Sequence, residues 1–275
     1  MTTAAKTYDG RRVLVVGGAT GMGAAAAQLA LEAGAAVTVM DRAAVDLDGV
    51  DAIEVDLSER ASVDAALDTF GGPLDALFSC AGVADGTPGI ERINFIGHRY
   101  LIDRLVEREW LTRGGAIGMI SSAAGLGWEA ELEVLLEFLH IADWDAAVEW
   151  VAAHGKADYL SMKRAMCAYV AWQARPMLAR GIRINAICPG PTDTPLAQAN
   201  AEMWLDFGAD YRADVGIAPS TPDEQAAVLL FLCSDAASAV NGQTVVSDAG
   251  YLAAGLSRAY EPAIPAAEFL YGRFG

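Results

Sequence analysis

The sequence is poor in basic residues. Its 275 residues include 19 lysines and arginines against 36 aspartates and glutamates, which gives a formal net charge of −17. A surface with this charge repels the phosphate backbone of nucleic acids and anionic lipid headgroups. We therefore expect neither a nucleic-acid partner nor a membrane partner.

Cysteines are few and scattered. The four thiols lie in apolar runs, without a CxxC pair or a His/Cys cluster beside them. This distribution is typical of reduced thiols in a core, so we expect no disulfide and no metal site. A long uninterrupted apolar run and a basic-then-apolar leader are also missing, and we expect a cytoplasmic protein.

Short apolar runs alternate with helix-like stretches along the chain. Runs that are continuously apolar are typical of parallel strands buried on both faces, which need crossover helices between them. The sequence therefore predicts an α/β fold, a doubly wound Rossmann-like parallel sheet of about seven strands, in one domain over residues 1–275. The expected strands are residues 12–16, 36–40, 52–55, 74–80, 116–120, 182–188 and 243–247. The expected helices are residues 23–33, 62–70, 90–110, 158–180 and 223–234.

Residues 128–157 interrupt this alternation. Apolar side chains recur there at helical spacing, first at Leu132, Leu135, Leu136 and Leu139, and again at Trp144, Ala147, Val148 and Val151. The pattern predicts a helical insert whose two amphipathic helices pack on the main domain, with a direct ligand role as the alternative. His140 and His154 are expected to be cap or surface residues.

A glycine-rich turn directly follows the first expected strand. Gly17, Gly21 and Gly23 form a G-x₃-G-x-G pattern, with Thr20 and Met22 inside it. Such a turn needs positive φ, lets the backbone approach a pyrophosphate closely, and directs the amino end of a helix at the anion. The turn therefore predicts a dinucleotide-binding site.

Acidic residues end the next two strands. Asp41 stands about 20 residues beyond the turn, where a carboxylate can bond both hydroxyls of the adenosine ribose. A 2′-phosphate would meet like charge there, which Arg42 softens without reversing, so the sequence predicts NAD rather than NADP. Asp56, followed by Leu57, is expected at the adenine edge.

A tyrosine and a lysine lie four residues apart in the expected helix 158–180. This spacing puts Tyr159 and Lys163 on one helix face, where the ammonium would lower the pKa of the phenol towards working pH. Ser121 and Ser122 end the fifth strand, at the carboxyl edge where doubly wound sheets bind ligands.

Together these motifs resemble the classical short-chain dehydrogenase/reductase family over nearly the whole chain. The branch they are most similar to is the bacterial 3α-hydroxysteroid dehydrogenase/carbonyl reductases. The matching segments are the glycine turn, Cys80-Ala81-Gly82 in place of Asn-Ala-Gly, Asn94, the set of Ser122, Tyr159 and Lys163, and Pro189-Gly190 with Thr192 and Thr194.

The resemblance implies a role for each of these residues. Tyr159 would be the general acid/base, Ser122 rather than Ser121 would bind the substrate oxygen, and Lys163 would bind the nicotinamide ribose. Asn94 would hold a water in a proton relay. The remaining cofactor contacts would be Cys80, Ala81 and Gly82, with Pro189, Gly190, Thr192 and Thr194 at the nicotinamide carboxamide.

The implied reaction is hydride transfer between NAD and a hydrophobic secondary alcohol or ketone, with 3α-hydroxysteroids as one candidate. Terpenoid or aryl carbinols are the alternative substrates. The alternative function from another class of protein is that of a non-catalytic, regulatory dinucleotide-binding module. A lid over residues 196–218, with Met203, Trp204, Leu205, Phe207 and Tyr211, favours an apolar substrate.

Two departures from the family pattern bear on structure. Cys80 replaces the usual asparagine, and Ser122 and Tyr159 lie 37 residues apart because the insert separates them. The resemblance implies a homodimer or homotetramer, and the insert is expected to obstruct the tetramer helix and leave a dimer. The C-terminal extension, residues 251–275, with Tyr260, Phe269, Tyr271 and Phe274, would close a neighbour's pocket or cover the core.

Overall fold

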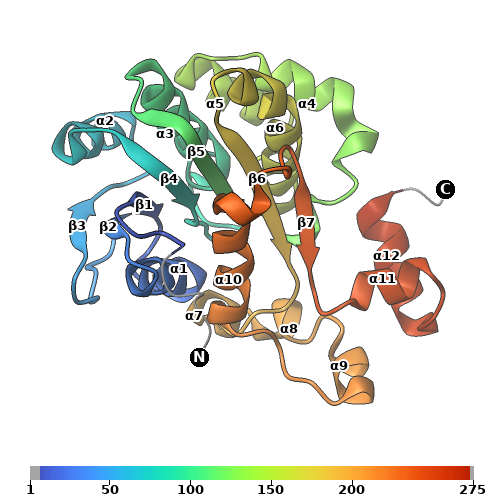
Figure 1. Ribbon diagram of the computed structural model, residues 1–275. Helices are drawn as coiled ribbons and strands as arrows, with labels where there is room; N and C mark the ends of the chain where they lie inside the picture. The colour runs from blue at the N-terminus through green and yellow to red at the C-terminus, as the bar shows by residue number, and fades with distance from the viewer. Residues whose placement is uncertain (1–6, 273–275) are drawn as a thin grey trace.

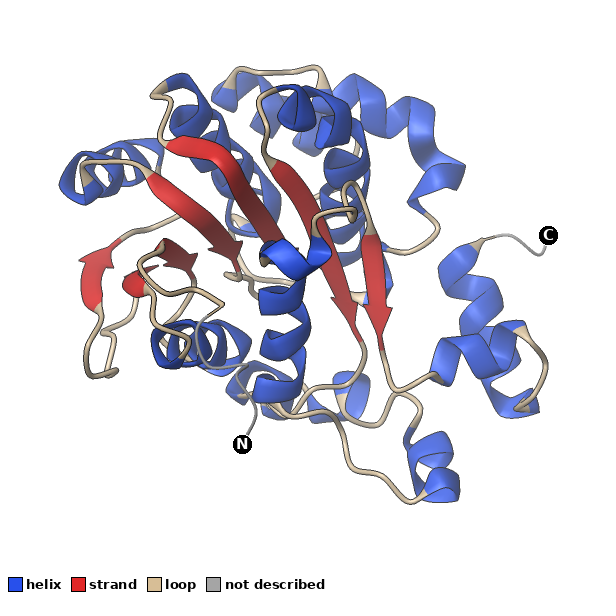
Figure 2. Cartoon of the chain, viewed as in Figure 1, coloured by secondary structure: helices blue, strands red, loops and turns tan. Residues whose placement is uncertain are grey.

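The computed structural model describes residues 7–272 and contains a seven-stranded parallel sheet with helices on both faces (Figures 1 and 2). The strand order is β3-β2-β1-β4-β5-β6-β7. The strands are β1 Arg12–Val16, β2 Ala36–Asp41, β3 Asp51–Glu54, β4 Leu74–Ser79, β5 Leu111–Ile120, β6 Arg183–Pro189 and β7 Thr244–Ser247. The predicted doubly wound fold is confirmed.

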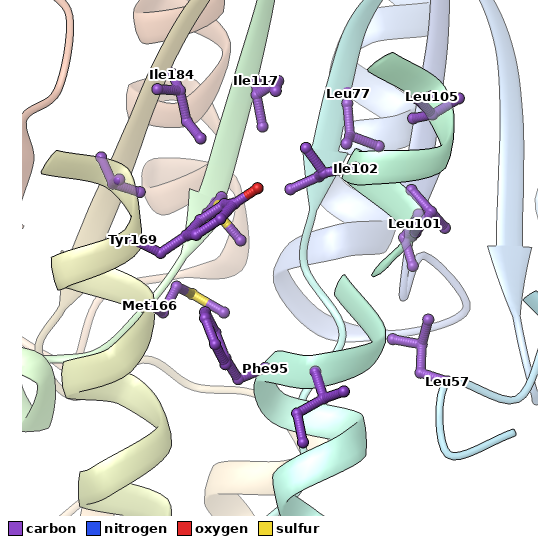
Figure 3. Packing of buried hydrophobic residues seen from close by; sticks show 14 of the residues in the cluster. Leu57, Leu77, Phe95, Leu101, Ile102, Leu105, Ile117, Met166, Tyr169 and Ile184 are labelled. Carbon is purple, nitrogen blue, oxygen red and sulfur yellow. The ribbon is translucent and has the colours of Figure 1, made fainter. Parts of the chain in front are cut away.

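Helices cover the sheet in two layers. One layer contains α1 Gly21–Glu32 and α10 Pro222–Cys233, whose alanines and leucines pack against the buried side chains of β1, β2 and β4. The other contains α2 Arg60–Phe70, α3 Gly97–Glu107 and α6 Tyr159–Ala179. Figure 3 shows part of this second layer, where Phe95, Met166 and Tyr169 meet Ile117 and Ile184. The reversal of strand order between β1 and β4 opens a crevice at the carboxyl edge of the sheet.

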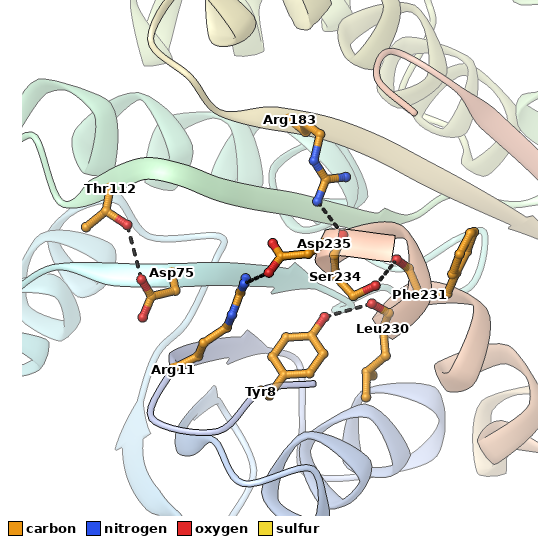
Figure 4. A network of polar contacts seen from close by, with 9 residues as sticks. All are labelled: Tyr8, Arg11, Asp75, Thr112, Arg183, Leu230, Phe231, Ser234 and Asp235. Atoms are coloured by element: carbon orange, nitrogen blue, oxygen red, sulfur yellow. Dashed lines mark hydrogen bonds and ion pairs between the residues drawn. The ribbon is translucent and has the colours of Figure 1, made fainter. Parts of the chain in front are cut away.

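The N-terminal segment is tied to the far end of α10. The Tyr8 hydroxyl donates to the Leu230 carbonyl at 2.7 Å, and Arg11 pairs with Asp235 at 2.5 Å (Figure 4). These contacts hold the start of β1 and the last helix of this layer together.

The predicted boundary between the helix at 90–110 and the strand that follows it was wrong. The helix includes a π-helical segment, Arg92–Ile96, continues as α3, and ends at Glu107. Glu109, with φ of 56°, reverses the chain, and β5 already begins at Leu111, which pairs with Leu74. The pairing of β5 with β4 shifts register between Leu74 and Ala76. The apolar run in the sequence therefore indicates only the part of β5 from Ala116 onwards, which pairs regularly.

The edge strand β3 also differs from expectation. Three of its four residues, Asp51, Ala52 and Glu54, are exposed, so it is not buried on both faces. It ends one residue early, which places Asp56 in the following loop rather than at the strand end.

The insert forms the predicted pair of helices, α4 Leu132–Leu139 and α5 Trp144–Ala153. Its apolar stripe packs on α3 and α6 through buried Leu135, Leu139, Trp144, Ala147 and Val151. Leu132 is the exception, at 37% exposed. His140 and His154 are the C-cap residues of the two helices, and each ring contacts a carbonyl one turn back, which confirms the cap prediction.

The segment after β6 forms three short helices, α7 Pro195–Gln198, α8 Ala201–Trp204 and α9 Ala209–Val215. The C-terminal extension forms α11 Tyr251–Leu256 and α12 Ile264–Tyr271, beyond the β7 edge (Figure 1). Leu252, Ala267 and Leu270 of these two helices pack on the loop after β5 at Ala123 and Leu126. Phe274 lies outside the described residues.

Over residues 7–272, no helix is both long and apolar enough to cross a membrane. The same residues contain no group of three or more His, Cys, Asp or Glu side chains arranged to hold a metal ion.

Candidate active site

Two adjoining cavities open at the carboxyl edge of the sheet, of about 230 Å³ and about 450 Å³. They share Met22, Cys80, Gly82, Thr194 and Leu196 in their walls. The smaller cavity is also lined by Gly17, Thr20, Gly21, Gly23, Asp41, Arg42, Asp56, Leu57 and Ala81. The larger is also lined by Ser122, Tyr159, Lys163, Pro189, Gly190 and Thr192. The structure thus brings every predicted site residue except Asn94 to one of the two cavities.

The glycine turn leaves no room for side chains. A Cβ at Gly23 would lie 1.9 Å from the Gly17 carbonyl oxygen, and one at Gly17 would lie 2.3 Å from the Ala81 backbone. Gly17 and Gly21 have φ of 84° and 59°, which disfavours other residues. The turn leads into α1, and Gly21, Met22 and Gly23 at the amino end of this helix line the smaller cavity, where helix N–H groups bind a pyrophosphate. These residues fit a dinucleotide.

Asp41 is held rigidly at the wall of this cavity. Its two carboxylate oxygens accept hydrogen bonds from the backbone N–H groups of Ala19 and Ala43, each at 2.9 Å. The negative charge is therefore fixed beside the glycine turn, with Arg42 in the same wall.

Asp56 is anchored by its own turn. Its Oδ1 accepts hydrogen bonds from the Ser58 backbone at 2.8 Å and from the Ser58 hydroxyl at 2.6 Å. These bonds, the hydroxyl bond first, hold the pKa of Asp56 below its usual value. The carboxylate is thus ionised where it borders the smaller cavity, next to Leu57.

Asn94 is buried in the π-helical segment and lines neither cavity. Its Nδ2 donates to the Val83 carbonyl at 3.0 Å, and its Oδ1 accepts from the Val83 N–H at 2.8 Å. The side-chain amide is thus engaged with the loop after β4, and its role in a water relay stays a prediction.

The two neighbouring serines have different surroundings. The Ser121 hydroxyl is buried and donates to the Lys163 carbonyl at 3.0 Å. The Ser122 side chain instead accepts from the Ala124 N–H at 3.2 Å and forms a hydrogen bond with Tyr159. Only Ser122 is therefore coupled to the phenol.

Tyr159 is the first residue of α6, and Lys163 follows one turn later. The Lys163 ammonium lies 5.5 Å from the centre of the Tyr159 ring and donates to the Ile120 carbonyl at 2.9 Å. The end of β5 thus fixes the lysine beneath the tyrosine.

The predicted depression of the phenol pKa was wrong for the protein alone. Burial raises the pKa of Tyr159 to about 12, although the hydrogen bond from Ser122 lowers it. Burial also lowers the pKa of Lys163 to about 8. Desolvation is the largest cause in both cases, because this enclosed site disfavours the charged form of each side chain.

Aromatic and apolar side chains form the rest of the larger cavity. The Trp204 ring lies 5.1 Å from the Tyr159 ring, and Phe207 lines the same wall. Leu205 and Tyr211 do not line it, and the Tyr211 hydroxyl donates instead to the Ala249 carbonyl at 3.1 Å. Three of the five expected lid side chains, Met203, Trp204 and Phe207, therefore border the cavity.

The C-terminal extension contributes to this cavity within the same chain. Phe269 and Leu270 of α12 are part of its wall. Gly127 makes this possible, since a Cβ there would lie 2.4 Å from the Leu270 carbonyl oxygen.

One polar residue beside the site was missed from the sequence. His98 is buried on α3, where its ring contacts Ser79 and the Ala81 carbonyl. The sequence signal for His98 was its position four residues after Asn94, because this spacing places both side chains on one helix face.

Comparison with known proteins agrees with this geometry. Residues 11–130 match the family model described as short chain dehydrogenase, and residues 144–252 match the model described as Enoyl-(Acyl carrier protein) reductase. Cis-4-hydroxycyclohexanecarboxylate dehydrogenase from Sinomonas cyclohexanicum is 30% identical over 90% of this chain and 99% of its own. Coniferyl-alcohol dehydrogenase from a Pseudomonas species is 28% identical over 87% of this chain and 96% of its own.

Among solved structures, the 3-alpha-hydroxysteroid dehydrogenase from Pseudomonas sp. B-0831, complexed with NADH, superposes with a TM-score of 0.72. It is 30% identical, over 90% of this chain and 98% of its own. The chain belongs to the short-chain dehydrogenase/reductase family. It is an oxidoreductase that binds a nicotinamide dinucleotide and acts on alcohols.

Proposed function

We propose that this protein is an NAD-dependent dehydrogenase of hydrophobic secondary alcohols, which also reduces the corresponding ketones. The observation that carries the proposal is the shared cavity wall of Ser122, Tyr159 and Lys163, next to the glycine-turn cavity. Bound NAD supplies the hydride acceptor for the carbinol carbon.

The residues of this chain handle the proton of the alcohol. Tyr159 takes the hydroxyl proton as general base, and returns it to the oxygen when a ketone is reduced. Ser122 holds the substrate oxygen and stabilises the phenolate through its hydrogen bond. Lys163 binds the nicotinamide ribose and stabilises the phenolate by its charge, anchored by the Ile120 carbonyl.

The cofactor would be held by both cavities. Gly17, Gly21 and Gly23 take the pyrophosphate, as their close packing and the amino end of α1 support. Further contacts come from Thr20, Met22, Arg42, Asp56, Leu57, Cys80, Ala81 and Gly82, with Pro189, Gly190, Thr192 and Thr194 at the carboxamide. Asn94 acts by fixing the loop at Val83 and supports the proton relay.

Asp41 selects NAD over NADP. Its carboxylate cannot turn away from a 2′-phosphate without breaking its hydrogen bonds to Ala19 and Ala43. The repulsion between like charges at contact distance in a partly dehydrated wall amounts to about 2–4 kcal/mol.

The substrate carries a ring system next to its carbinol. Trp204, whose ring lies 5.1 Å from that of Tyr159, and Phe207 provide flat apolar surface in the larger cavity. Phe269 and Leu270 of α12 add to its apolar wall. The name of a relative that acts on 3α-hydroxysteroids supports a secondary alcohol of this kind, and the name of one that acts on coniferyl alcohol, a primary alcohol, supports the ring system alone. Hydroxysteroids, terpenols and aryl carbinols all satisfy this description.

The protein would act in the cytoplasm as a single-domain subunit over residues 1–275, assembled as a homodimer or homotetramer. The packing of α4 on α6 covers that helix and favours a dimer through β7 and α10, where Phe231 is 49% exposed. A tetramer packed through α6 would contradict the dimer.

The function is tested by following dinucleotide reduction with a panel of hydroxysteroids, terpenols and aryl carbinols, with NAD and with NADP. Turnover of at least one ring-bearing secondary alcohol with NAD supports the proposal. Binding of NAD without turnover of any member would favour a non-catalytic module instead.

A further inference from the structure

His98 connects α3 to the loop that lies between the two cavities. The side chain is 1% exposed and touches the residues on either side of Cys80, namely the Ser79 side chain and the Ala81 backbone. We infer that His98 is a positioning residue that fixes the Ala81 carbonyl, and with it the wall against which the dinucleotide binds. The inference rests on the proposed dinucleotide site.

The hydrogen bonds determine which tautomer is present. The His98 Nε2 lies 2.9 Å from the Ala81 carbonyl oxygen, which can only accept, so Nε2 carries the proton. Nδ1 then accepts from the Ser79 hydroxyl, at 2.5 Å. The neutral ring therefore holds two successive points of the chain at the end of β4 in a fixed relation.

The position of Ala81 decides the shape of the glycine turn. The Ala81 N–H donates to the Val16 carbonyl at 2.9 Å, just before the turn begins. Gly17 packs so closely that a Cβ there would lie 2.3 Å from both the Ala81 nitrogen and its Cα. A shift of Ala81 by a few tenths of an ångström would therefore displace the turn.

The same helix holds the far end of this loop. Asn94, one turn before His98, bonds both backbone groups of Val83. The loop 80–83 is thus fastened at two places, at Val83 by Asn94 of the π-helical segment and at Ala81 by His98 of α3. Cys80 stands just before Ala81, and its thiol is a much weaker hydrogen-bonding group than an imidazole. Without His98, the half-buried Ala81 carbonyl would lose this partner, and the loop would move to find another.

Two substitutions separate the two hydrogen bonds. The amide nitrogen of His98→Gln can occupy the place of Nε2 and donate to Ala81, whereas the shorter side chain of His98→Asn reaches only towards Ser79. We expect His98→Asn to raise both the Kd for NADH and the KM for NAD about tenfold. His98→Gln should restore both to within about threefold of the wild type, and kcat and the KM for the alcohol at saturating NAD should change less than twofold in either variant.

Ser79→Ala is the matched control, because it removes the other hydrogen bond of the ring and keeps the bond to Ala81. It should change the Kd for NADH less than twofold, although it lowers stability towards urea. Equal weakening of NADH binding by Ser79→Ala and His98→Asn would overturn the inference. So would variants that lose stability but bind NADH as the wild type does.

The controls also separate this inference from the proposed function. If the wild type binds no dinucleotide, the proposed function fails. If the wild type binds NADH and His98→Asn binds it equally well, only the role of His98 fails. Should His98→Asn not fold, His98→Met takes its place, because a thioether cannot donate a hydrogen bond to the Ala81 carbonyl. NADH binding by His98→Met as tight as that by Ser79→Ala would overturn the inference.

Discussion

Acid should destabilise this protein through His98 by an amount that the structure defines. Burial lowers the pKa of His98 from 6.5 to about 4. The bond to Ala81 opposes this shift, and the charge of Lys163 adds to it. Between these values the unfolded chain binds the proton and the folded chain does not. Stability is therefore lost as the pH falls from about 6.5 towards about 4. The full loss is about 3 kcal/mol, and about 2 kcal/mol of it falls between pH 7 and pH 5.

Urea unfolding of the wild type and of His98→Gln at pH 7 and pH 5 measures this contribution. The glutamine does not titrate, so any stability advantage of the wild type at pH 7 should shrink by about 2 kcal/mol at pH 5. The substitution His140→Gln, at the exposed C-cap of α4, controls for replacing a histidine as such. A stability difference between wild type and His98→Gln that is the same at both pH values would refute the reasoning.

Four further predictions concern the site. Asp41→Asn should raise kcat/KM for NADP relative to NAD at least tenfold, measured by steady-state kinetics with both cofactors; an unchanged ratio would refute its role. Ser122→Ala removes a hydrogen bond that lowers the pKa of Tyr159, so the pH at which kcat/KM for alcohol oxidation rises should move upwards. A pH profile unchanged from that of the wild type would speak against this hydrogen bond. Phe269→Ala should raise the KM for steroid-sized alcohols about tenfold and leave that for small ones unchanged, while equal effects on both would remove α12 from the substrate site. Gly23→Ala should weaken NADH binding more than a hundredfold, because its Cβ would lie 1.9 Å from the Gly17 carbonyl oxygen, and titration with NADH checks this.

The order of elements could be predicted from the sequence because parallel strands are marked by buried apolar runs. The residues of β6 are all buried, and its boundaries were predicted to within one residue. The start of β5 could not be predicted in this way, because Leu111 pairs with Leu74 before a register shift, and the next four residues, Thr112, Arg113, Gly114 and Gly115, form no apolar run. The edge strand β3 has little burial, so its apolar pattern was misleading.

The positions of the site residues were predictable where a local motif determines them. The glycine turn, Asp41 and the pair of Tyr159 and Lys163 each have a spacing that reflects one turn or one helix face. Burial of Tyr159 could not be judged in this way, because the walls around it come from α8 and α12, far away in the sequence. The raised pKa of the phenol follows from those distant contacts.

The most direct test of the account replaces the proposed general base. Tyr159→Phe keeps the ring against Trp204 and removes only the hydroxyl. Turnover of the best alcohol of the panel with NAD should fall by about a thousandfold, and the Kd for NADH should stay within about twofold. Tyr260→Phe, which changes a tyrosine outside both cavities, should keep wild-type turnover. Wild-type turnover by Tyr159→Phe would contradict the account.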